Sequence, residues 1–152
     1  MKYNCEKGNL FDLPKDQYVF AHCIAADLKW GAGIAPIIIE KEFNATKYCR
    51  YDKDGGVLPD GALSVGAAFA VPTEKGVLVN LITKEYTYEK PTYDTLRKAL
   101  YALKAYLSKT DYNKLAIPKI GCGLDKLEWP KVESMLKTIF ADTDLEIEVR
   151  YL

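Results

Sequence analysis

Apolar residues along this chain of 152 residues recur with two different periods, one typical of strands and one typical of helices. Short segments rich in apolar and β-branched residues predict six strands. These strands cover residues 2–6, 17–24, 64–71, 77–83, 114–120 and 146–152. Apolar residues spaced three and four apart predict three helices. These helices cover residues 34–43, 92–107 and 130–141.

The apolar content of each strand predicts its place in the sheet. Segments 77–82 and 115–120 are almost continuously apolar, which is typical of central strands that helices cover on both faces. Segment 146–152 alternates between polar and apolar residues, so we expect it nearer an edge. The alternation of strands and helices predicts one three-layer α/β/α domain over residues 1–152, with a polar, Gly- and Asp-rich loop at residues 44–61.

Composition limits the partners and the compartment. Lys and Arg together number 21, as do Asp and Glu, so no net charge attracts nucleic acid or an acidic membrane. The four cysteines are scattered and His22 is the sole histidine, which predicts neither a structural metal site nor a disulfide framework. No apolar run approaches the roughly 20 residues that span a bilayer, and the N-terminal residues lack an apolar leader segment. We therefore expect a reducing cytoplasm.

Two glycine-rich segments are candidates for phosphate binding. WGAGIAP at residues 30–36 leads into a predicted helix, where backbone N–H groups and the helix dipole favour an anion. IGCGLD at residues 120–125 follows a predicted strand. Ligands of open α/β sheets gather beyond the carboxyl ends of the strands. We therefore expect the two loops to converge on one pyrophosphate, although each pattern alone is also compatible with a structural turn.

Lys84 ends a predicted strand, and Asp125 follows the second glycine-rich loop. A neutral lysine amine attacks an aldehyde-like or anomeric carbon, and a nearby carboxylate can move the protons. The alternatives are a solvated strand end for Lys84 and a helix cap for Asp125. Asp27 either orients a ligand hydroxyl or ends its strand. A Cys122–His22 nucleophile is disfavoured, because the histidine lies in an apolar strand where a core role is commoner.

Taken together, these segments resemble the macrodomain family, and within it the branch of terminal ADP-ribose protein glycohydrolases. The matching motifs occur in order along nearly the whole chain, and LITK together with GCGLD is the most specific combination. The motifs are KGNLF at 7–11, AHCIAAD at 21–27, WGAGIA at 30–35, LITK at 81–84, KPTY at 90–93 and IPKIGCGLDKLEW at 117–129. The resemblance implies a mixed sheet of about six strands between helices, with ADP-ribose in a cleft at the strand ends.

The resemblance also implies roles for individual residues. Asn9 and Leu10 would lie at the adenine site, with the C-terminal Leu152 beside the adenosine. Lys84 would attack the anomeric carbon of the distal ribose, and Asp125 would act as the acid/base that helps to form and resolve the lysine adduct. The residues implied to meet the ribose and phosphate portions are Ala25, Asp27, Gly31, Ala32, Gly33 and Ile34. Those implied to cover the diphosphate and distal ribose are Lys119, Ile120, Gly121, Cys122, Gly123 and Leu124.

The chain departs from the family pattern at two places. Many macrodomains hold the adenine amine with an aspartate in the first loop, whereas this chain has Asn9, whose carbonyl can accept the same hydrogen bond. Macrodomains that activate a water carry an asparagine-rich loop, whereas this chain has HCIAAD at 22–27. The second departure favours the lysine route.

The resemblance implies an ADP-ribosyl hydrolase that removes ADP-ribose from acidic side chains as glutamate esters, deacylates O-acyl-ADP-ribose, or does both. It implies no metal and no other cofactor. The partners would be ADP-ribose and ADP-ribosylated protein, with a monomeric protein and no membrane. Three alternatives stay open: an ADP-ribosyl-nucleic-acid hydrolase, an ADP-ribose 1″-phosphate phosphatase and a non-catalytic ADP-ribose reader. The presence of both Lys84 and Asp125 argues against the reader, because binding alone requires neither.

Overall fold

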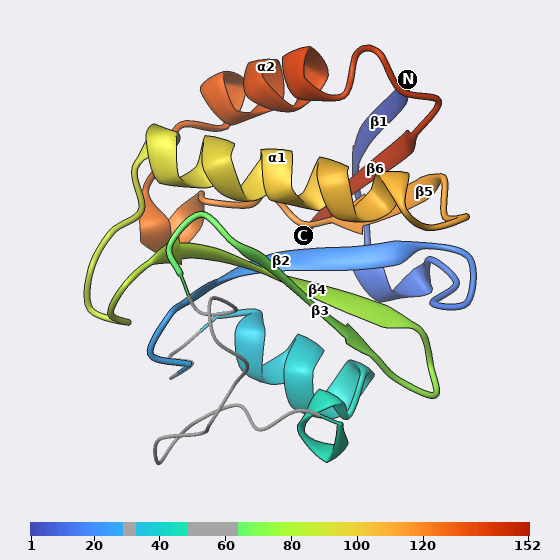
Figure 1. Cartoon of the computed structure of the whole chain (residues 1–152), viewed down its shortest axis with the longest axis horizontal. Helices are drawn as coiled ribbons and strands as arrows, with labels where there is room; N and C mark the ends of the chain where they lie inside the picture. The colour runs from blue at the N-terminus through green and yellow to red at the C-terminus, as the bar shows by residue number, and fades with distance from the viewer. Residues whose placement is uncertain (29–32, 49–63) are drawn as a thin grey trace.

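A central mixed sheet carries the elements that position the candidate site (Figure 1). The computed structural model describes residues 1–28, 33–48 and 64–152. Within these ranges, six strands form the sheet in the order β1-β6-β5-β2-β4-β3. They are β1 (Lys2–Lys7), β2 (Val19–Ala25), β3 (Ala68–Pro72), β4 (Val77–Lys84), β5 (Lys114–Ile117) and β6 (Glu146–Tyr151). β3 runs antiparallel to β4, and the other neighbouring strands are parallel.

The strand order agrees in part with the apolar pattern of the sequence. β4 and β5 lie on either side of the central β2, and every residue of β4 before Lys84 is buried. β6 is one strand from the edge, as its alternating pattern predicts, but the continuously apolar β4 is also one strand from the opposite edge. Two of the predicted strands, 64–71 and 114–120, are each three residues longer than the observed strands. β5 ends at Ile117, because Pro118 has no N–H for a ladder hydrogen bond. β3 begins only at Ala68, because a turn with Gly66 at a φ of +94° precedes it.

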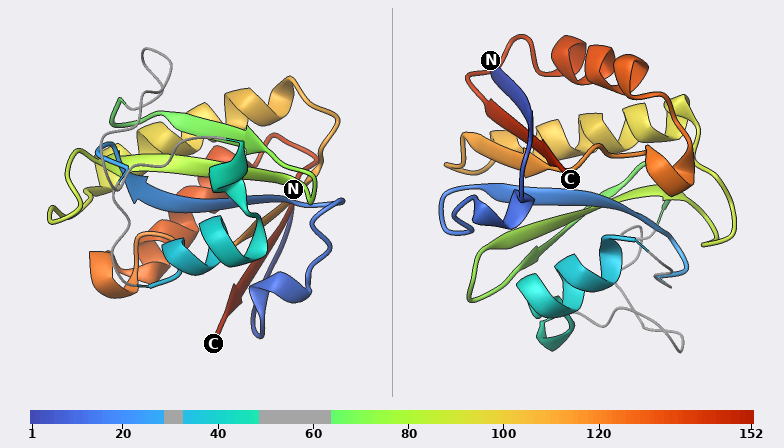
Figure 2. Two further views of the ribbon diagram at one scale, coloured as in Figure 1. Left: turned by 90° about the horizontal axis from the view of Figure 1, so that it is seen from below. Right: turned by 180° about the vertical axis from the view of Figure 1, so that it is seen from behind.

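Two α-helices cover one face of the sheet, as the views in Figures 1 and 2 show: α1 (Tyr93–Ser108) and α2 (Trp129–Ile139). α1 begins with a capping box, in which Thr92 and Thr95 each accept a hydrogen bond from the other's backbone N–H. Pro130 lies in the first turn of α2, where the missing N–H has no helical partner to lose. The predicted helices 92–107 and 130–141 are confirmed, with ends shifted by one or two residues.

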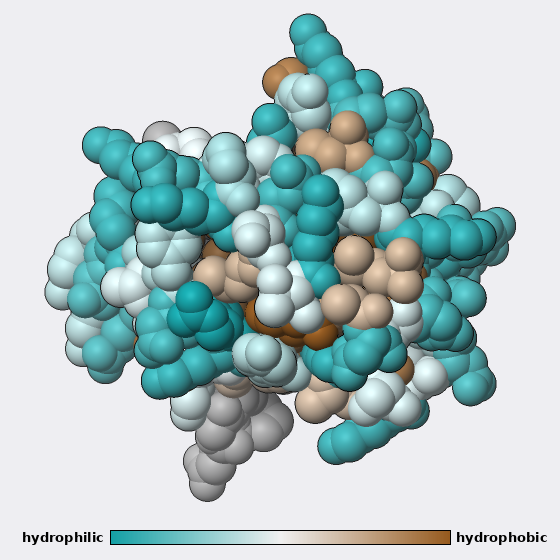
Figure 3. Space-filling view, turned by 90° about the horizontal axis from the view of Figure 1, so that it is seen from above, coloured by the Kyte–Doolittle hydropathy of each residue, from teal (hydrophilic) through white to brown (hydrophobic). Residues whose placement is uncertain are grey.

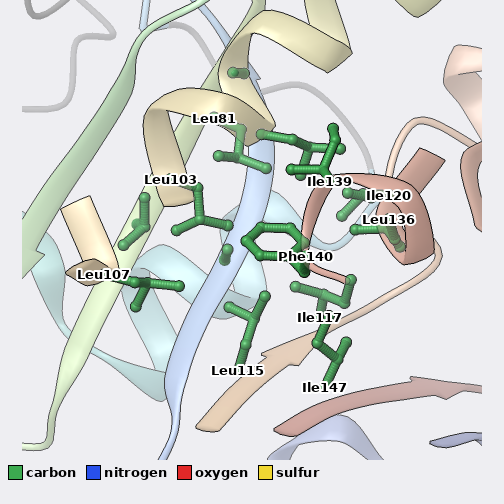
Figure 4. Close-up of a cluster of buried hydrophobic side chains, with 14 of the residues drawn as sticks. Leu81, Leu103, Leu107, Leu115, Ile117, Ile120, Leu136, Ile139, Phe140 and Ile147 are labelled. Atoms are coloured by element: carbon green, nitrogen blue, oxygen red, sulfur yellow. The ribbon is translucent and has the colours of Figure 1, made fainter. Parts of the chain in front are cut away.

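The apolar stripes of these helices pack on the strands and form with them the larger of the two buried clusters. Figure 4 shows Phe140 among side chains from α1, α2 and the strands, including Leu103, Leu115 and Ile117. Fully burying one such side chain contributes roughly 1.5–3 kcal/mol. The outer surface of the helical layer is mostly hydrophilic (Figure 3). None of the helices within the described ranges combines the length and apolar character needed to cross a membrane.

Short helices cover the opposite face: η1 (Leu10–Asp12), η2 (Ile37–Glu42) and η3 (Ala45–Lys47). The helix predicted over 34–43 is present, but its residues 37–42 form the π-helix η2 in place of an α-helix. In this wider helix the Phe43 N–H donates to the Ile38 carbonyl at 3.1 Å, five residues back. The wider turn lets both side chains reach the core under the sheet, where Phe43 packs edge-to-face on Phe20. The predicted three-layer arrangement is therefore confirmed.

Candidate active site

A cavity of about 500 Å³ opens where β2, β4 and β5 end. The parallel strands bring their carboxyl ends to one edge of the sheet, so segments far apart in sequence meet there. The volume is within the range of roughly 300–1,000 Å³ that is typical of small-molecule sites. Ten of the predicted site residues line the cavity: Ala25, Gly33, Ile34, Lys84, Lys119, Ile120, Gly121, Cys122, Gly123 and Asp125.

Lys84 and Asp125, 41 residues apart in sequence, meet in this cavity. The Lys84 Nζ donates a hydrogen bond to the Asp125 Oδ1 at 3.0 Å, and the two side chains are only 13% and 20% exposed. Lys84 ends the buried strand β4, and Asp125 lies in η4 (Gly123–Asp125), one 3-10 turn after the glycine-rich loop. Neither structural alternative fits: Lys84 is not a solvated strand end, and Glu128 holds the cap position of α2. The two groups are brought together, while their catalytic roles stay a prediction.

The glycine-rich loop that carries Asp125 depends on Gly121. Gly121 has a φ of +72°, and a Cβ there would lie 2.9 Å from the Leu127 Cδ1 and 3.3 Å from the Leu96 Cδ2. The Leu127 N–H donates to the Gly121 carbonyl at 2.8 Å, which folds the loop back on itself. Backbone conformation and packing thus both select glycine at this position.

His22 and Cys122, which could be taken for a base and its nucleophile, also line the cavity. Asn80 holds the histidine. The Asn80 Nδ2 donates to the Phe69 carbonyl at 3.1 Å, so its Oδ1 is left to accept from the His22 Nε2 at 2.6 Å. Burial lowers the pKa of His22 to about 4, which keeps the imidazole neutral near pH 7.

The cysteines of the cavity are protonated near neutral pH. Burial, reinforced by the nearby Asp125 carboxylate, raises the pKa of the Cys23 thiol to about 12. Burial also raises the pKa of the Cys122 thiol. A protonated thiol is a poor nucleophile and a poor metal ligand. Within the described ranges, no group of three or more His, Cys, Asp or Glu side chains is placed to hold a metal ion.

Asp27 fastens the loop that follows β4 to the end of β2. The Thr87 N–H donates to the Asp27 Oδ2 at 2.9 Å, and the Thr87 hydroxyl donates to the Oδ1 at 2.8 Å. The Ala26 N–H donates to the Lys84 carbonyl at 2.8 Å and extends the contact. Asp27 is not among the described residues that line the cavity, whereas Thr87 is. Its carboxylate therefore has a clear structural role, and its contact with ribose or phosphate stays a prediction.

The residues predicted at the adenine end are not among those that line this cavity. The Asn9 Oδ1 accepts a hydrogen bond from the Phe11 N–H at 3.0 Å and so caps η1, which uses the carbonyl predicted to hold the adenine amine. Leu10 is buried in the core, and Leu152 is 94% exposed. None of these predicted contacts lines the cavity. Gly31 and Ala32 lie outside the described residues, as does the side chain of Leu124.

Charged residues around the cavity are mostly basic. Among the described lining residues, the charged side chains are Lys84, Lys90, Lys119 and Asp125. The Lys119 ammonium lies over the Tyr151 ring, 3.7 Å from the Nζ to the ring centroid. Such a lining favours an anionic ligand.

Sequence reasoning overlooked several residues of the cavity wall. The residues missed are His22, Cys23, Ile24, Ala35, Thr87, Lys90 and Pro118. The KPTY motif was the available signal for Lys90, because it lies in the loop that follows Lys84. His22 and Cys23 sit in a continuous apolar run, where no pattern distinguishes a cavity wall from the core.

No family model matches the chain. The human ADP-ribose glycohydrolase OARD1 is 37% identical over 145 residues, which cover 94% of this chain and 87% of that protein. The bovine ADP-ribose glycohydrolase OARD1 is 36% identical over the same shares of the two chains.

Solved structures show the same fold. The macrodomain of Mycobacterium tuberculosis DarG is similar with a TM-score of 0.81 and 18% identity, covering 99% of this chain and 97% of that one. Thermosipho africanus DarTG, solved in complex with ADP-ribose, is similar with a TM-score of 0.75 and 15% identity, covering 98% of this chain and 41% of that one. The fold, the ordered motifs and the identity to OARD1 agree, and the chain belongs to the macrodomain family, in the branch of the ADP-ribose glycohydrolase OARD1.

Proposed function

We propose that this protein is an ADP-ribosyl hydrolase that releases ADP-ribose from glutamate esters and deacylates O-acyl-ADP-ribose through a lysine adduct. The observation that carries the proposal is the hydrogen bond of 3.0 Å between Lys84 and Asp125 inside a cavity of about 500 Å³. The activity named for the OARD1 relatives supports the same substrate class.

The paired side chains suit a reaction in which an amine is first deprotonated and then regenerated. Asp125 accepts a proton from the Lys84 ammonium, and the neutral amine attacks C1″ of the distal ribose. The bond between C1″ and the ester oxygen breaks, and the glutamate leaves as a carboxylate. After the sugar ring opens, the nitrogen is joined to C1″ as an imine.

Hydrolysis of that imine completes the cycle. Water adds to C1″, the bond between carbon and nitrogen breaks, and the proton held near Asp125 returns to the amine. Free ADP-ribose leaves and the Lys84–Asp125 pair is restored. An acyl ester at the same carbon follows the same route, with the carboxylate of the acyl group as the leaving group.

The rest of the cavity supports a diphosphate next to the reacting sugar. Lys90 and Lys119 add positive charge to the wall. Gly121 and Gly123 have no side chain, which leaves that part of the backbone open to a ligand. In a pure reader, by contrast, the Asp125 carboxylate would repel the phosphates without helping binding. This observation favours the enzyme over the non-catalytic alternative.

We also propose a reducing compartment such as the cytoplasm. Cys5, Cys23 and Cys122 are free thiols in the structure. Free thiols persist where glutathione and thioredoxin keep them reduced.

The proposal is tested by incubating the protein with glutamate-linked mono-ADP-ribosylated protein and following free ADP-ribose by chromatography. We expect release by the wild type and none by Lys84→Ala. Lys75→Ala is the matched control, because this exposed lysine lies in the turn at the opposite end of β4. Release by Lys84→Ala at the wild-type rate would contradict the mechanism.

A further inference from the structure

Two exposed tyrosines form a stacked pair beside the proposed nucleophile. The rings of Tyr86 and Tyr88 have centroids 5.5 Å apart and planes within 2° of parallel. Tyr88 is 81% exposed and Tyr86 is 43% exposed. They follow Lys84 by two and four residues, in the loop that joins β4 to α1. Large apolar side chains held in solvent are typical of binding surfaces.

The loop is held at several points, so the rings are presented in a defined position. The Tyr86 N–H donates to the Glu89 Oε1 at 2.8 Å, and the Glu89 N–H donates to the Tyr86 carbonyl at 3.0 Å. Between the two tyrosines, Thr87 is bound to Asp27 and lines the cavity. The aromatic pair therefore flanks the cavity wall on the side of Lys84.

The group attached to the distal ribose must leave the cavity near this loop. If Lys84 attacks C1″, the acceptor bonded to C1″ lies within a few ångströms of the amine when the reaction begins. The chain on either side of the modified residue then extends outwards from Lys84. Thr87 lines the cavity together with Lys84, and Tyr86 and Tyr88 stand on either side of Thr87 in the sequence, so we expect the first residues of that chain at this loop.

The charges of the loop favour a cation on these rings. Glu85 is exposed and Glu89 is half-buried, so carboxylates stand on both sides of the tyrosine pair in the sequence. The basic residue that follows, Lys90, lines the cavity. A guanidinium group stacks on a tyrosine face and pairs with a carboxylate, whereas these carboxylates would repel the phosphates of a nucleic-acid strand.

On the basis of the proposed function, we infer that Tyr86, Tyr88 and Glu85 form a subsite for an arginine side chain of the protein acceptor, close in sequence to the ADP-ribosylated glutamate. The subsite would select among modified proteins. It would take no part in the chemistry at C1″.

The test uses peptides that are ADP-ribosylated on one glutamate. Each peptide carries arginine at one position within three residues of that glutamate, and its matched partner carries glutamine there. We expect the wild type to prefer the best arginine peptide by about five- to tenfold in kcat/KM, as a contact with an exposed ring and a carboxylate allows. The preference should fall below about twofold in Tyr86→Ala/Tyr88→Ala and decrease in Glu85→Gln. The preference is the ratio of kcat/KM for the arginine peptide to kcat/KM for its glutamine partner, both measured with one variant. A general loss of activity lowers both values and leaves this ratio unchanged.

Tyr101→Ala is the matched control, because Tyr101 is a 50% exposed tyrosine on α1, and this variant should keep the full preference. Equal kcat/KM for all peptide pairs in the wild type would overturn the subsite, while turnover of O-acetyl-ADP-ribose in the same preparation would leave the proposed function intact. Loss of turnover on every substrate would overturn the proposed function and the subsite with it.

A single-stranded oligonucleotide with an ADP-ribosylated base is the last probe. Suppose that release of ADP-ribose from this oligonucleotide is lost in Tyr88→Ala, while the preference for arginine peptides is unchanged in that variant. This result would assign the rings to a nucleobase and overturn the arginine subsite.

Discussion

Replacement of Gly121 by alanine should destabilise the protein by an amount that the structure predicts. The new Cβ would lie 2.9 Å from the Leu127 Cδ1 and 3.3 Å from the Leu96 Cδ2. Leu96 is fully buried and has little room to move in a close-packed core. Overpacking of this kind costs roughly 1–3 kcal/mol. The φ of +72° adds roughly 1–2 kcal/mol for a residue with a Cβ. We therefore expect Gly121→Ala to lower the free energy of unfolding by about 2–5 kcal/mol.

Gly123 separates the two contributions. Its φ of +74° is almost the same, but among the described residues no atom outside its chain neighbours lies within 4 Å of the Cβ that alanine would add. Gly123→Ala should therefore show only the backbone cost of roughly 1–2 kcal/mol. Urea unfolding of both variants, followed by tryptophan fluorescence, gives the difference between them. Equal losses of unfolding free energy, within about 0.5 kcal/mol, would refute the proposed clash with Leu96 and Leu127.

Three further predictions concern the charged and titrating groups. Lys84→Ala should abolish turnover while ADP-ribose affinity stays within roughly tenfold, about 1.4 kcal/mol, because the phosphates and the adenine should carry most of the binding; calorimetry measures this. Asp125→Ala should accumulate a lysine-linked adduct or stall before it, which intact-mass spectrometry detects. Folding lowers the pKa of His22 from 6.5 to about 4, so the unfolded state binds the proton first as pH falls. The free energy of unfolding should therefore decrease by about 3 kcal/mol between pH 6.5 and pH 4.

Each of these predictions has a result that would contradict it. A collapse of affinity in Lys84→Ala would mean that the amine is mainly a binding group. Wild-type turnover by Asp125→Ala would remove the carboxylate from the chemistry. His22 is the single histidine of the chain, so one imidazole signal in a nuclear magnetic resonance titration reports its pKa directly. A midpoint near 6.5 in the folded protein would show that the ring is not held neutral by burial.

The layers could be predicted because burial makes apolar residues recur along the sequence with the period of each strand or helix. β4 is apolar at nearly every position, which only a strand covered on both faces requires. The π-helix was missed because the spacing of Ile38 and Phe43 differs from an α-helical spacing by one residue, and only the packing against the sheet selects the wider turn. The early end of β5 was missed although Pro118 carried the signal.

The reactive pair could be predicted because each residue follows a recognisable strand or glycine-rich loop. Parallel strands guarantee that such segments meet at one edge, so Lys84 and Asp125 could be expected to converge without any knowledge of the distance. The roles of Asn9 and Asp27 could not be predicted in the same way. Asparagine and aspartate bind nearby backbone N–H groups as readily as they bind ligands, and Phe11 and Thr87 provide those groups here.

The structure places the reacting groups and the recognition surface on parts of the fold that differ in how strongly they are constrained. Lys84 ends a strand that is buried along its length, and Asp125 lies on a loop that Gly121 and Leu127 close tightly. Any change there disturbs both packing and chemistry. The residues between Lys84 and Lys90 are held mainly through Thr87 and one turn, with the tyrosine side chains in solvent. Substitution of those side chains changes little of the core, so the loop can acquire a new acceptor preference while the Lys84–Asp125 pair keeps its geometry.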